Sequence, residues 1–260
     1  MKPTTSHLWR LASEAIAILY RAAPGYEARL TQQASLILSG EPVADLNVAI
    51  IDRGPESEDC LRQFAHVIKK RNLPIMALLT AEVSDQLAPI AQDLDLRHAG
   101  QIPLMTHHPF DTPPAERTNY QIERVEGVKD LREVGGILAS AFELPLESCN
   151  RVLWEALLEG PGMDVFLARE NGHAVSALQS TRAGDIVGIW AMGTRSERQR
   201  KGVGRALLDY VIAYHYAHGA KLFYLWATEA GKPLYERIGF QTITQAAVWV
   251  AGHSTQVSSH

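Results

Sequence analysis

The sequence predicts a mixed α/β protein in two parts. The C-terminal domain has a mixed sheet, in which an antiparallel meander precedes a β-α-β unit, and a smaller α/β domain comes before it. Apolar patterns of strand and helix period alternate along most of the 260 residues. A polar stretch with three prolines, from Thr106 to Tyr120, interrupts them and is typical of a linker. The expected boundaries are residues 1–105, a linker at 106–118, a second domain at 119–252 and a flexible tail at 253–260.

The N-terminal part begins with an amphipathic helix, for which Thr5 or Ser6 is the expected cap. Two short extended runs and a more apolar strand follow, and then a helix, a strand and a second helix. These segments are residues 28–33, 34–39, 46–52, 57–70, 74–80 and 83–94. The stretch from Arg97 to Met105 leads into the linker.

The C-terminal part has a less regular order of elements. A strand is followed by two helices, three strands, a helix, a strand, a short helix and a last strand. These segments are residues 120–125, 128–142, 146–158, 164–170, 174–181, 185–192, 202–214, 221–228, 232–238 and 241–252. Short glycine turns between the three central strands favour antiparallel hairpins. The later strand–helix–strand order favours a parallel pair, so the sheet is mixed.

Composition excludes several classes of protein. A net charge of −4 gives no basic field, so nucleic acid is not an expected partner. Two cysteines, Cys60 and Cys149, are too few for a disulfide framework and fit a reducing compartment. No apolar run reaches the roughly 18 residues of a membrane helix, and Arg10 and Glu14 interrupt the apolar face of the first helix. We therefore expect a soluble, cytoplasmic monomer or homodimer with no membrane partner.

The most informative stretch is QRKGVGRALL, from Gln199 to Leu208. An apolar stripe of period 3.6 predicts a helix that begins at about Gly202 and docks on the sheet. The stripe consists of Val203, Ala206, Leu207, Tyr210, Val211 and Tyr214. The unsatisfied N–H groups of a first helical turn attract an anion, and Gly202 and Gly204 let a phosphate approach the main chain. Positive charge nearby comes from Arg200, Lys201 and Arg205.

Three kinds of phosphate-binding turn compete for this stretch, beside a plain strand-to-helix turn. A Walker A loop is excluded because no Gly-Lys-Ser/Thr follows. A dinucleotide-binding turn is a weak match, because Leu207 stands at the third glycine position and a charged loop separates the turn from the strand. Glu229 is the acid that such a site would use. The third kind has the pattern Gln/Arg-x-x-Gly-x-Gly/Ala, which Gln199, Gly202 and Gly204 satisfy in register.

This last pattern is the acyl-CoA turn of the GCN5-related N-acetyltransferases, and the chain resembles that family well beyond six residues. GIWAMGTRSERQRKGVGRALL is similar to the family's fourth strand, loop and third helix. LFYLWATEAGKPLYERIGF, from Leu222 to Phe240, is similar to its fifth strand, fourth helix and the start of its sixth strand. The resemblance covers about Tyr120 to Gly252. The N-terminal part resembles a second, degenerate unit without the glycine turn.

The resemblance implies a set of site residues. Main-chain groups at the end of the fourth strand would pair with the pantetheine arm of acetyl-CoA, which can act as an added strand. These groups belong to Met192, Gly193 and Thr194. The turn that would bind the pyrophosphate comprises Gln199, Arg200, Lys201, Gly202, Val203, Gly204 and Arg205. Thr228 stands where many members have an asparagine that contacts the cofactor.

Acyl transfer needs an acid for the leaving thiolate, and Tyr235 matches the family's tyrosine beside the sulfur. No base is assigned, because Gly188 stands where some members have a strand glutamate. Other acids on the acceptor side are Glu143, Glu147 and Glu229, and a water relay is an equal alternative. The tryptophans that could line the acceptor pocket are Trp154, Trp190 and Trp226. His107 and His108 have no further ligand at metal spacing, so no metal is expected.

The resemblance therefore implies an N-acetyltransferase that transfers an acetyl group from acetyl-CoA to a primary amine. No cysteine falls on the motifs, which favours direct attack in a ternary complex over a covalent acyl-enzyme. A small or amino-acid-like acceptor is the first expectation. A protein N-terminus or lysine is the alternative within the enzyme class. A non-catalytic acetyl-CoA-binding or sensing module is the alternative outside it.

Overall fold

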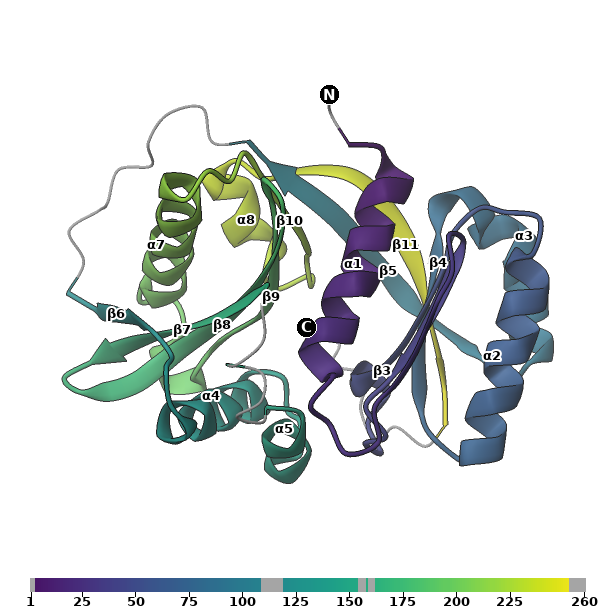
Figure 1. The fold of residues 1–260 in the computed structure, drawn as a ribbon, viewed down its shortest axis with the longest axis horizontal. Coiled ribbons are helices and arrows are strands. Elements are labelled where there is room, and N and C mark those ends of the chain that lie inside the picture. The colour runs from purple at the N-terminus through teal and green to yellow at the C-terminus, as the bar shows by residue number, and fades with distance from the viewer. Residues whose placement is uncertain (1–2, 109–118, 154–157, 159–161, 253–260) are drawn as a thin grey trace.

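The computed structural model describes residues 3–108, 119–153, 158 and 162–252 (Figure 1). The N-terminal part has one helix, three strands, and then an alternation of helices and strands. Its elements are α1 (Thr5–Tyr20), β1 (Glu27–Leu30), β2 (Ala34–Leu38), η1 (Ala44–Leu46), β3 (Asn47–Ile51), α2 (Ser57–Arg71), β4 (Ile75–Thr80), α3 (Ala81–Asp93) and β5 (Arg97–His107). The cap of α1 is Thr4 rather than Thr5 or Ser6, because the Thr4 side chain accepts the N–H of His7 at 3.2 Å.

The C-terminal part follows the expected order of elements. These are β6 (Gln121–Arg124), α4 (Val128–Ala141), α5 (Leu146–Val152), β7 (Met163–Glu170), β8 (His173–Ala183), β9 (Ile186–Thr194), η2 (Ser196–Arg198), α7 (Val203–Ala217), β10 (Leu222–Trp226), α8 (Lys232–Ile238) and β11 (Gln241–Ala251). Helix α5 ends at Val152, and most of the remainder of the helix expected over residues 146–158 lies outside the described residues, as does Trp154. The linker core at 109–118 and the tail at 253–260 also lie outside them.

Within the described residues, all the strands form a single sheet in the order β1-β2-β3-β4-β11-β5-β10-β9-β8-β7-β6. Strands β3 and β4 are parallel, as are β9 and β10, and the other neighbouring pairs are antiparallel. A mixed sheet was predicted for the C-terminal part, and the structure extends it through the N-terminal part. No described helix is both long enough and apolar enough to cross a membrane.

The two parts exchange their last strands at the centre of this sheet. Strand β5 of the N-terminal part lies between β10 and β11 and pairs antiparallel with both. Strand β11 of the C-terminal part lies between β4 and β5. The stretch from Arg97, expected only to lead into the linker, is thus an 11-residue strand that ends at His107, two residues into the expected linker. The centroid of the His107 ring lies 5.1 Å from that of Phe240, and burial lowers the pKa of His107.

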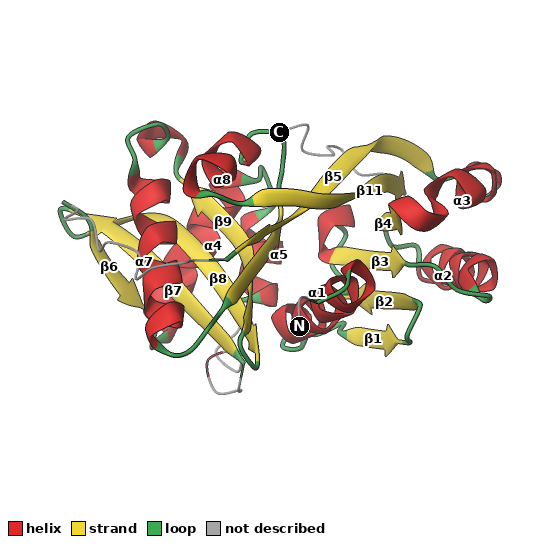
Figure 2. Ribbon diagram, turned by 90° about the horizontal axis from the view of Figure 1, so that it is seen from above, coloured by secondary structure: helices red, strands yellow, loops and turns green. Residues whose placement is uncertain are grey.

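Helices cover both faces of the sheet (Figures 1 and 2). On one face, α1, α4 and α5 share a core with strands of both parts. On the other face, α7 and α8 cover the C-terminal strands, whereas α2 and α3 cover the N-terminal strands. Helix α7 docks through Val203, Leu207 and Val211 as predicted, but Tyr210 is 40% exposed and Leu208 and Ile212 are buried in its place.

Candidate functional site

The central feature of the C-terminal part is an opening between two parallel strands. Strands β9 and β10 pair only over Ile186–Gly188 and Leu222–Tyr224. Beyond Gly188, β9 continues to Thr194, whereas β10 ends at Trp226. In the described structure, no strand pairs with the β10-facing edge of β9 over this stretch. Its main-chain groups are therefore available to an extended ligand.

A β-bulge marks the open stretch of β9. Gly193 lies opposite Ala177 and Trp190 lies opposite Gln179, so two residues of β9 face one residue of β8. Ala191, inside the bulge, has φ 44°, a conformation that costs a non-glycine residue about 1–3 kcal/mol. In a regular strand, Trp190 and Met192 would point to the same face of the sheet. Because of the bulge they do not: Trp190 belongs to the core under α1 and α4, and Met192 packs against the core under α7 and α8.

The glycine turn follows η2 and ends at the N-terminus of α7. Arg200 and Gly202 both have positive φ, of 58° and 85°, which gives successive N–H groups the concave arrangement of an anion-binding nest. The turn is tied down on both sides: the Gln199 amide donates to the Thr194 carbonyl at 3.2 Å, and the Tyr120 hydroxyl donates to the Lys201 carbonyl at 2.9 Å.

The predicted start of α7 is confirmed, with Gly202 as its N-cap. The Ala206 N–H makes the first helical bond, to the Gly202 carbonyl at 3.0 Å. The N–H groups of the three preceding residues therefore have no helical acceptor and suit an anion. A Cβ on Gly204 would lie 3.1 Å from Met192 Cε, so the glycine allows α7 to pack closely on the bulge. Arg205 forms an ion pair with Asp209 at 2.7 Å, while Arg200 and Lys201 are exposed at the turn.

Tyr235 of α8 lies on the same face of the sheet as α7 and the Met192 side chain. Its hydroxyl lies 3.9 Å from Met192 Sδ, and the side chain is 8% exposed. Burial raises the pKa of Tyr235 to about 12, so the hydroxyl is protonated at neutral pH. Thr228 supports the turn before α8, where its Oγ1 accepts the Gly231 N–H at 3.1 Å.

Trp190 explains the missing glutamate on the opposite face. A Cβ on Gly188 would lie 2.6 Å from Trp190 Nε1, so the indole occupies the space into which a side chain at position 188 would extend. Trp190 Nε1 donates to Thr181 Oγ1 at 2.8 Å. Trp226 packs on Trp190, with ring centroids 5.5 Å apart. The Trp226 ring also lies 5.5 Å from that of Trp9 on α1.

Sequence reasoning missed Trp9, because an apolar residue on the buried side of a helix carries no sign of which part of the chain it contacts. The three candidate acids lie on separate segments of the chain. Glu147 forms an ion pair with Arg151, and Glu229 is exposed in the turn after β10. Glu143 has φ 53° just after α4. No base emerges from the described residues.

In the described residues, the N-terminal part has no equivalent opening between its parallel strands. The parallel strands β3 and β4 are paired from Val48 to Ile51 of β3, and Ile51 is the last residue of β3. This pair therefore does not separate as β9 and β10 do. The sequence after β3 is DRGPES, without the glycine pattern of the other part. Among residues 3–108, therefore, the parallel pair leaves no gap for an added strand, and the chain after β3 lacks the glycine pattern of the phosphate turn.

Comparison with known proteins agrees with this geometry. The sequence profile of the acetyltransferase (GNAT) domain matches residues 161–242, which contain β7 to α8 and so the bulge, the glycine turn and Tyr235. This segment is therefore similar in sequence to the GNAT domain. No functionally curated protein matches the sequence.

Solved structures show a likeness in fold over most of the chain. A GCN5-related N-acetyltransferase from Kribbella flavida has a TM-score of 0.70 at 19% identity, over 95% of this chain and 97% of that one. A GCN5-related N-acetyltransferase from Sphaerobacter thermophilus has a TM-score of 0.65 at 18% identity, over 89% and 83%. A tandem GNAT protein from the clavulanic acid biosynthesis pathway has a TM-score of 0.59 at 14% identity, over 95% and 93%. At these identities the likeness establishes the GNAT fold.

Proposed function

We propose that the protein is an acyl-CoA-dependent N-acetyltransferase that acetylates a small primary amine by direct attack in a ternary complex. The observation that carries the proposal is the convergence of three features at one place. The unpaired edge of β9, the anion-binding turn before α7 and the Tyr235 hydroxyl all lie around the bulge at Ala191 and Met192.

In this proposal, acetyl-CoA enters the opening as an added strand. The main chain of Met192, Gly193 and Thr194 pairs with the pantetheine amides. The N–H groups from Arg200 to Arg205 bind the pyrophosphate, as the nest and the helix dipole favour. Thr228 Oγ1 accepts the Gly231 N–H, and its own hydroxyl proton can donate to the cofactor.

The chemistry follows from the position of Tyr235. A neutral amine attacks the thioester carbon, the C–S bond breaks, and the sulfur leaves as a thiolate. The proton that the nitrogen loses balances the proton that the thiolate finally gains. With its pKa raised to about 12, the phenol is a weaker acid than a thiol, whose ordinary value is about 8.5. Its contribution is therefore a hydrogen bond that stabilises the developing thiolate.

The cysteines support direct attack. Cys149 is buried on α5, and burial raises its pKa to about 11, so almost no thiolate forms at neutral pH. Cys60 lies on α2, partly buried against the core of the N-terminal part, and burial raises its pKa as well. Neither has the low pKa of a nucleophile that forms an acyl-enzyme.

One observation favours a second candidate, a non-catalytic acetyl-CoA-binding module. The Trp190 indole fills the space at Gly188 where a basic carboxylate would stand. A screen of CoA release from acetyl-CoA separates the two. Catalysis predicts amine-dependent release with at least one small amine, amino acid or peptide, whereas a binding module gives only background hydrolysis across the panel.

The same assay tests the role of Tyr235. We expect Tyr235→Phe to lower kcat about ten- to a hundredfold, because one hydrogen bond to the leaving group is lost. Acetyl-CoA affinity, measured by calorimetry, should stay within about threefold of the wild type. Equal kcat in the two proteins would exclude the hydroxyl from the reaction.

A further inference from the structure

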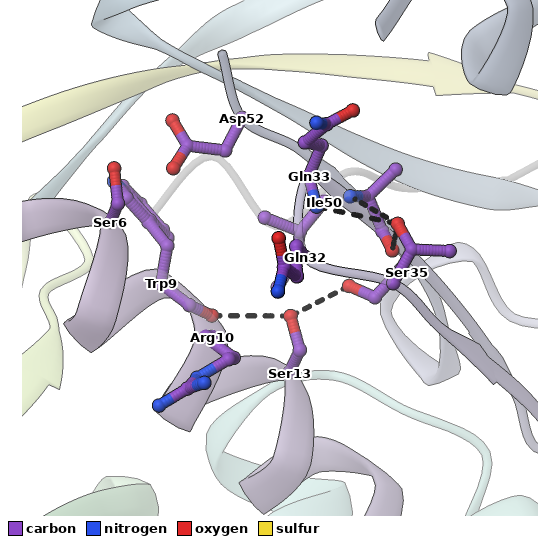
Figure 3. Close-up of a pocket in the computed structure, with 11 residues that line it drawn as sticks. Ser6, Trp9, Arg10, Ser13, Gln32, Gln33, Ser35, Ile50 and Asp52 are labelled. Atoms are coloured by element: carbon purple, nitrogen blue, oxygen red, sulfur yellow. Dashed lines mark hydrogen bonds between the residues drawn. The ribbon is translucent and has the colours of Figure 1, made fainter. Parts of the chain in front are cut away.

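The N-terminal part contains a polar hollow that the acyl-transfer site does not use (Figure 3). It lies between the first turns of α1, the turn that joins β1 to β2, and the end of β3. An inner chamber of about 10 Å³ opens beside an outer groove of about 300 Å³. The two share four lining residues, Arg10, Ser13, Thr31 and Gln32. The inner chamber has room for one water-sized group.

A buried carboxylate is the main feature of the inner chamber. Asp52, directly after β3, is 6% exposed, and its Oδ1 accepts the Thr80 hydroxyl at 2.9 Å. In the part of the chain that the structure describes, Asp52 has no ion-pair partner. A buried carboxylate without a counter-ion is costly, so the site favours a cation from outside the chain.

Arg10, Ser13 and Ser35, which line the chamber, already have partners within the chain. Arg10 binds His7 Nδ1 at 3.0 Å and lies 3.9 Å from Glu14, and Figure 3 shows it at the opposite end of the hollow from the Asp52 carboxylate. Ser13 and Ser35 bond to each other at 2.6 Å. Within the described structure, nothing in the chain therefore supplies the positive charge that Asp52 calls for.

The chemistry of the lining identifies the kind of cation. The inner chamber is lined by one carboxylate, Asp52, together with Arg10 and neutral groups, and the outer groove adds Glu14, which is paired with Arg10. This lining supplies too little negative charge for Mg²⁺ or Ca²⁺. A primary ammonium group is the size of a water, carries a single charge and donates three hydrogen bonds. Oxygen acceptors beside Asp52 are available on Ser6 and Gln33, which line the same chamber.

We infer that the N-terminal part binds a small primary amine, with its ammonium group on Asp52 and the rest of the molecule in the outer groove. Asp52 follows β3, and β4, β11, β5 and β10 lie between β3 and β9 in the sheet. Trp9, which lines the chamber, contacts Trp226 at the end of β10. The inference does not depend on the proposed acetyltransferase activity.

The test uses the full chain and three probes at neutral pH: propylamine, propan-1-ol and tetramethylammonium. Amide chemical shifts should respond saturably to propylamine at residues 6–13, 31–35 and 52. Propan-1-ol lacks the charge and tetramethylammonium lacks the donors, so neither should produce these shifts. Absence of saturable shifts with propylamine, or equal shifts with propan-1-ol, would overturn the inference.

Asp52→Asn keeps an oxygen for the Thr80 hydroxyl and removes the charge. It should weaken propylamine binding about ten- to a hundredfold, as expected for a lost charge-assisted hydrogen bond. Asp93→Asn, at an exposed position on α3, is the matched control and should bind as the wild type does. Equal binding by the Asp52 variant would refute the site. If that variant does not fold, the shifts of the wild-type protein decide the question.

Discussion

The glycine turn permits a test in which backbone strain and ligand contact are separated. Gly202, at the start of α7, has φ 85°, and an added Cβ would meet nothing within 4 Å. Gly172, in the β7–β8 hairpin, has φ 81° and equally open surroundings. Replacing either by alanine therefore costs about the same, on the order of 1 kcal/mol, because the left-handed conformation disfavours a Cβ at both positions.

Only one of the two glycines faces the proposed pyrophosphate. In Gly202→Ala the new methyl group stands on the open side of the nest, where the phosphate oxygens would approach the N–H groups. We expect acetyl-CoA affinity to fall at least about tenfold, or about 1.4 kcal/mol, in Gly202→Ala and to stay unchanged in Gly172→Ala.

Urea unfolding and titration calorimetry measure the two quantities on the same samples. The reasoning requires equal losses of unfolding free energy and unequal losses of affinity. If both variants bind acetyl-CoA as tightly as the wild type, the turn does not hold the pyrophosphate. If both lose affinity equally, the effect is one of stability and the assignment of Gly202 has no support.

Three further predictions concern the fold. His215, on α7, is buried against the Ser180 hydroxyl at 2.8 Å, and burial lowers its pKa to about 4. The unfolded chain binds a proton at this histidine near pH 6.5, whereas the folded chain does not. The group therefore lowers the free energy of unfolding by about 2 kcal/mol between pH 7 and pH 5. Urea unfolding of His215→Gln should lack that part of the pH dependence, and an unchanged dependence would contradict the prediction. A fragment of residues 119–260 lacks β5, which lies between β10 and β11 in the sheet. Its unfolding, followed by circular dichroism, should not be cooperative unless a fragment of residues 1–108 is added. A stable isolated fragment that binds acetyl-CoA would disprove the structural role of β5. Gly188→Glu should not supply a base but should destabilise the protein by about 1–3 kcal/mol, since its Cβ collides with the Trp190 indole; a gain in kcat in the CoA-release assay would contradict this.

The sequence by itself determined the local elements, including the glycine turn before α7. Helix α8 spans residues 232–238 as predicted, because Pro233 in its first turn and Gly239 in left-handed conformation at its end fix both boundaries locally. Gly202 caps α7 for the same kind of reason: the chain has to turn through positive φ there. The assignment of residues to the proposed site remains a prediction that binding and kinetics can test.

Tertiary structure alone decided how the two parts join and what shapes the opening. Strand β5 was not recognised, because Gly100 and Pro103 interrupt its pattern and its partners lie far along the chain, as with Leu104 opposite Trp226. The positive φ of Ala191 carries no signal in its residue type, since the ladder with β8 imposes the bulge. Pairing and burial between distant segments set these features, and a local sequence pattern contains no record of them.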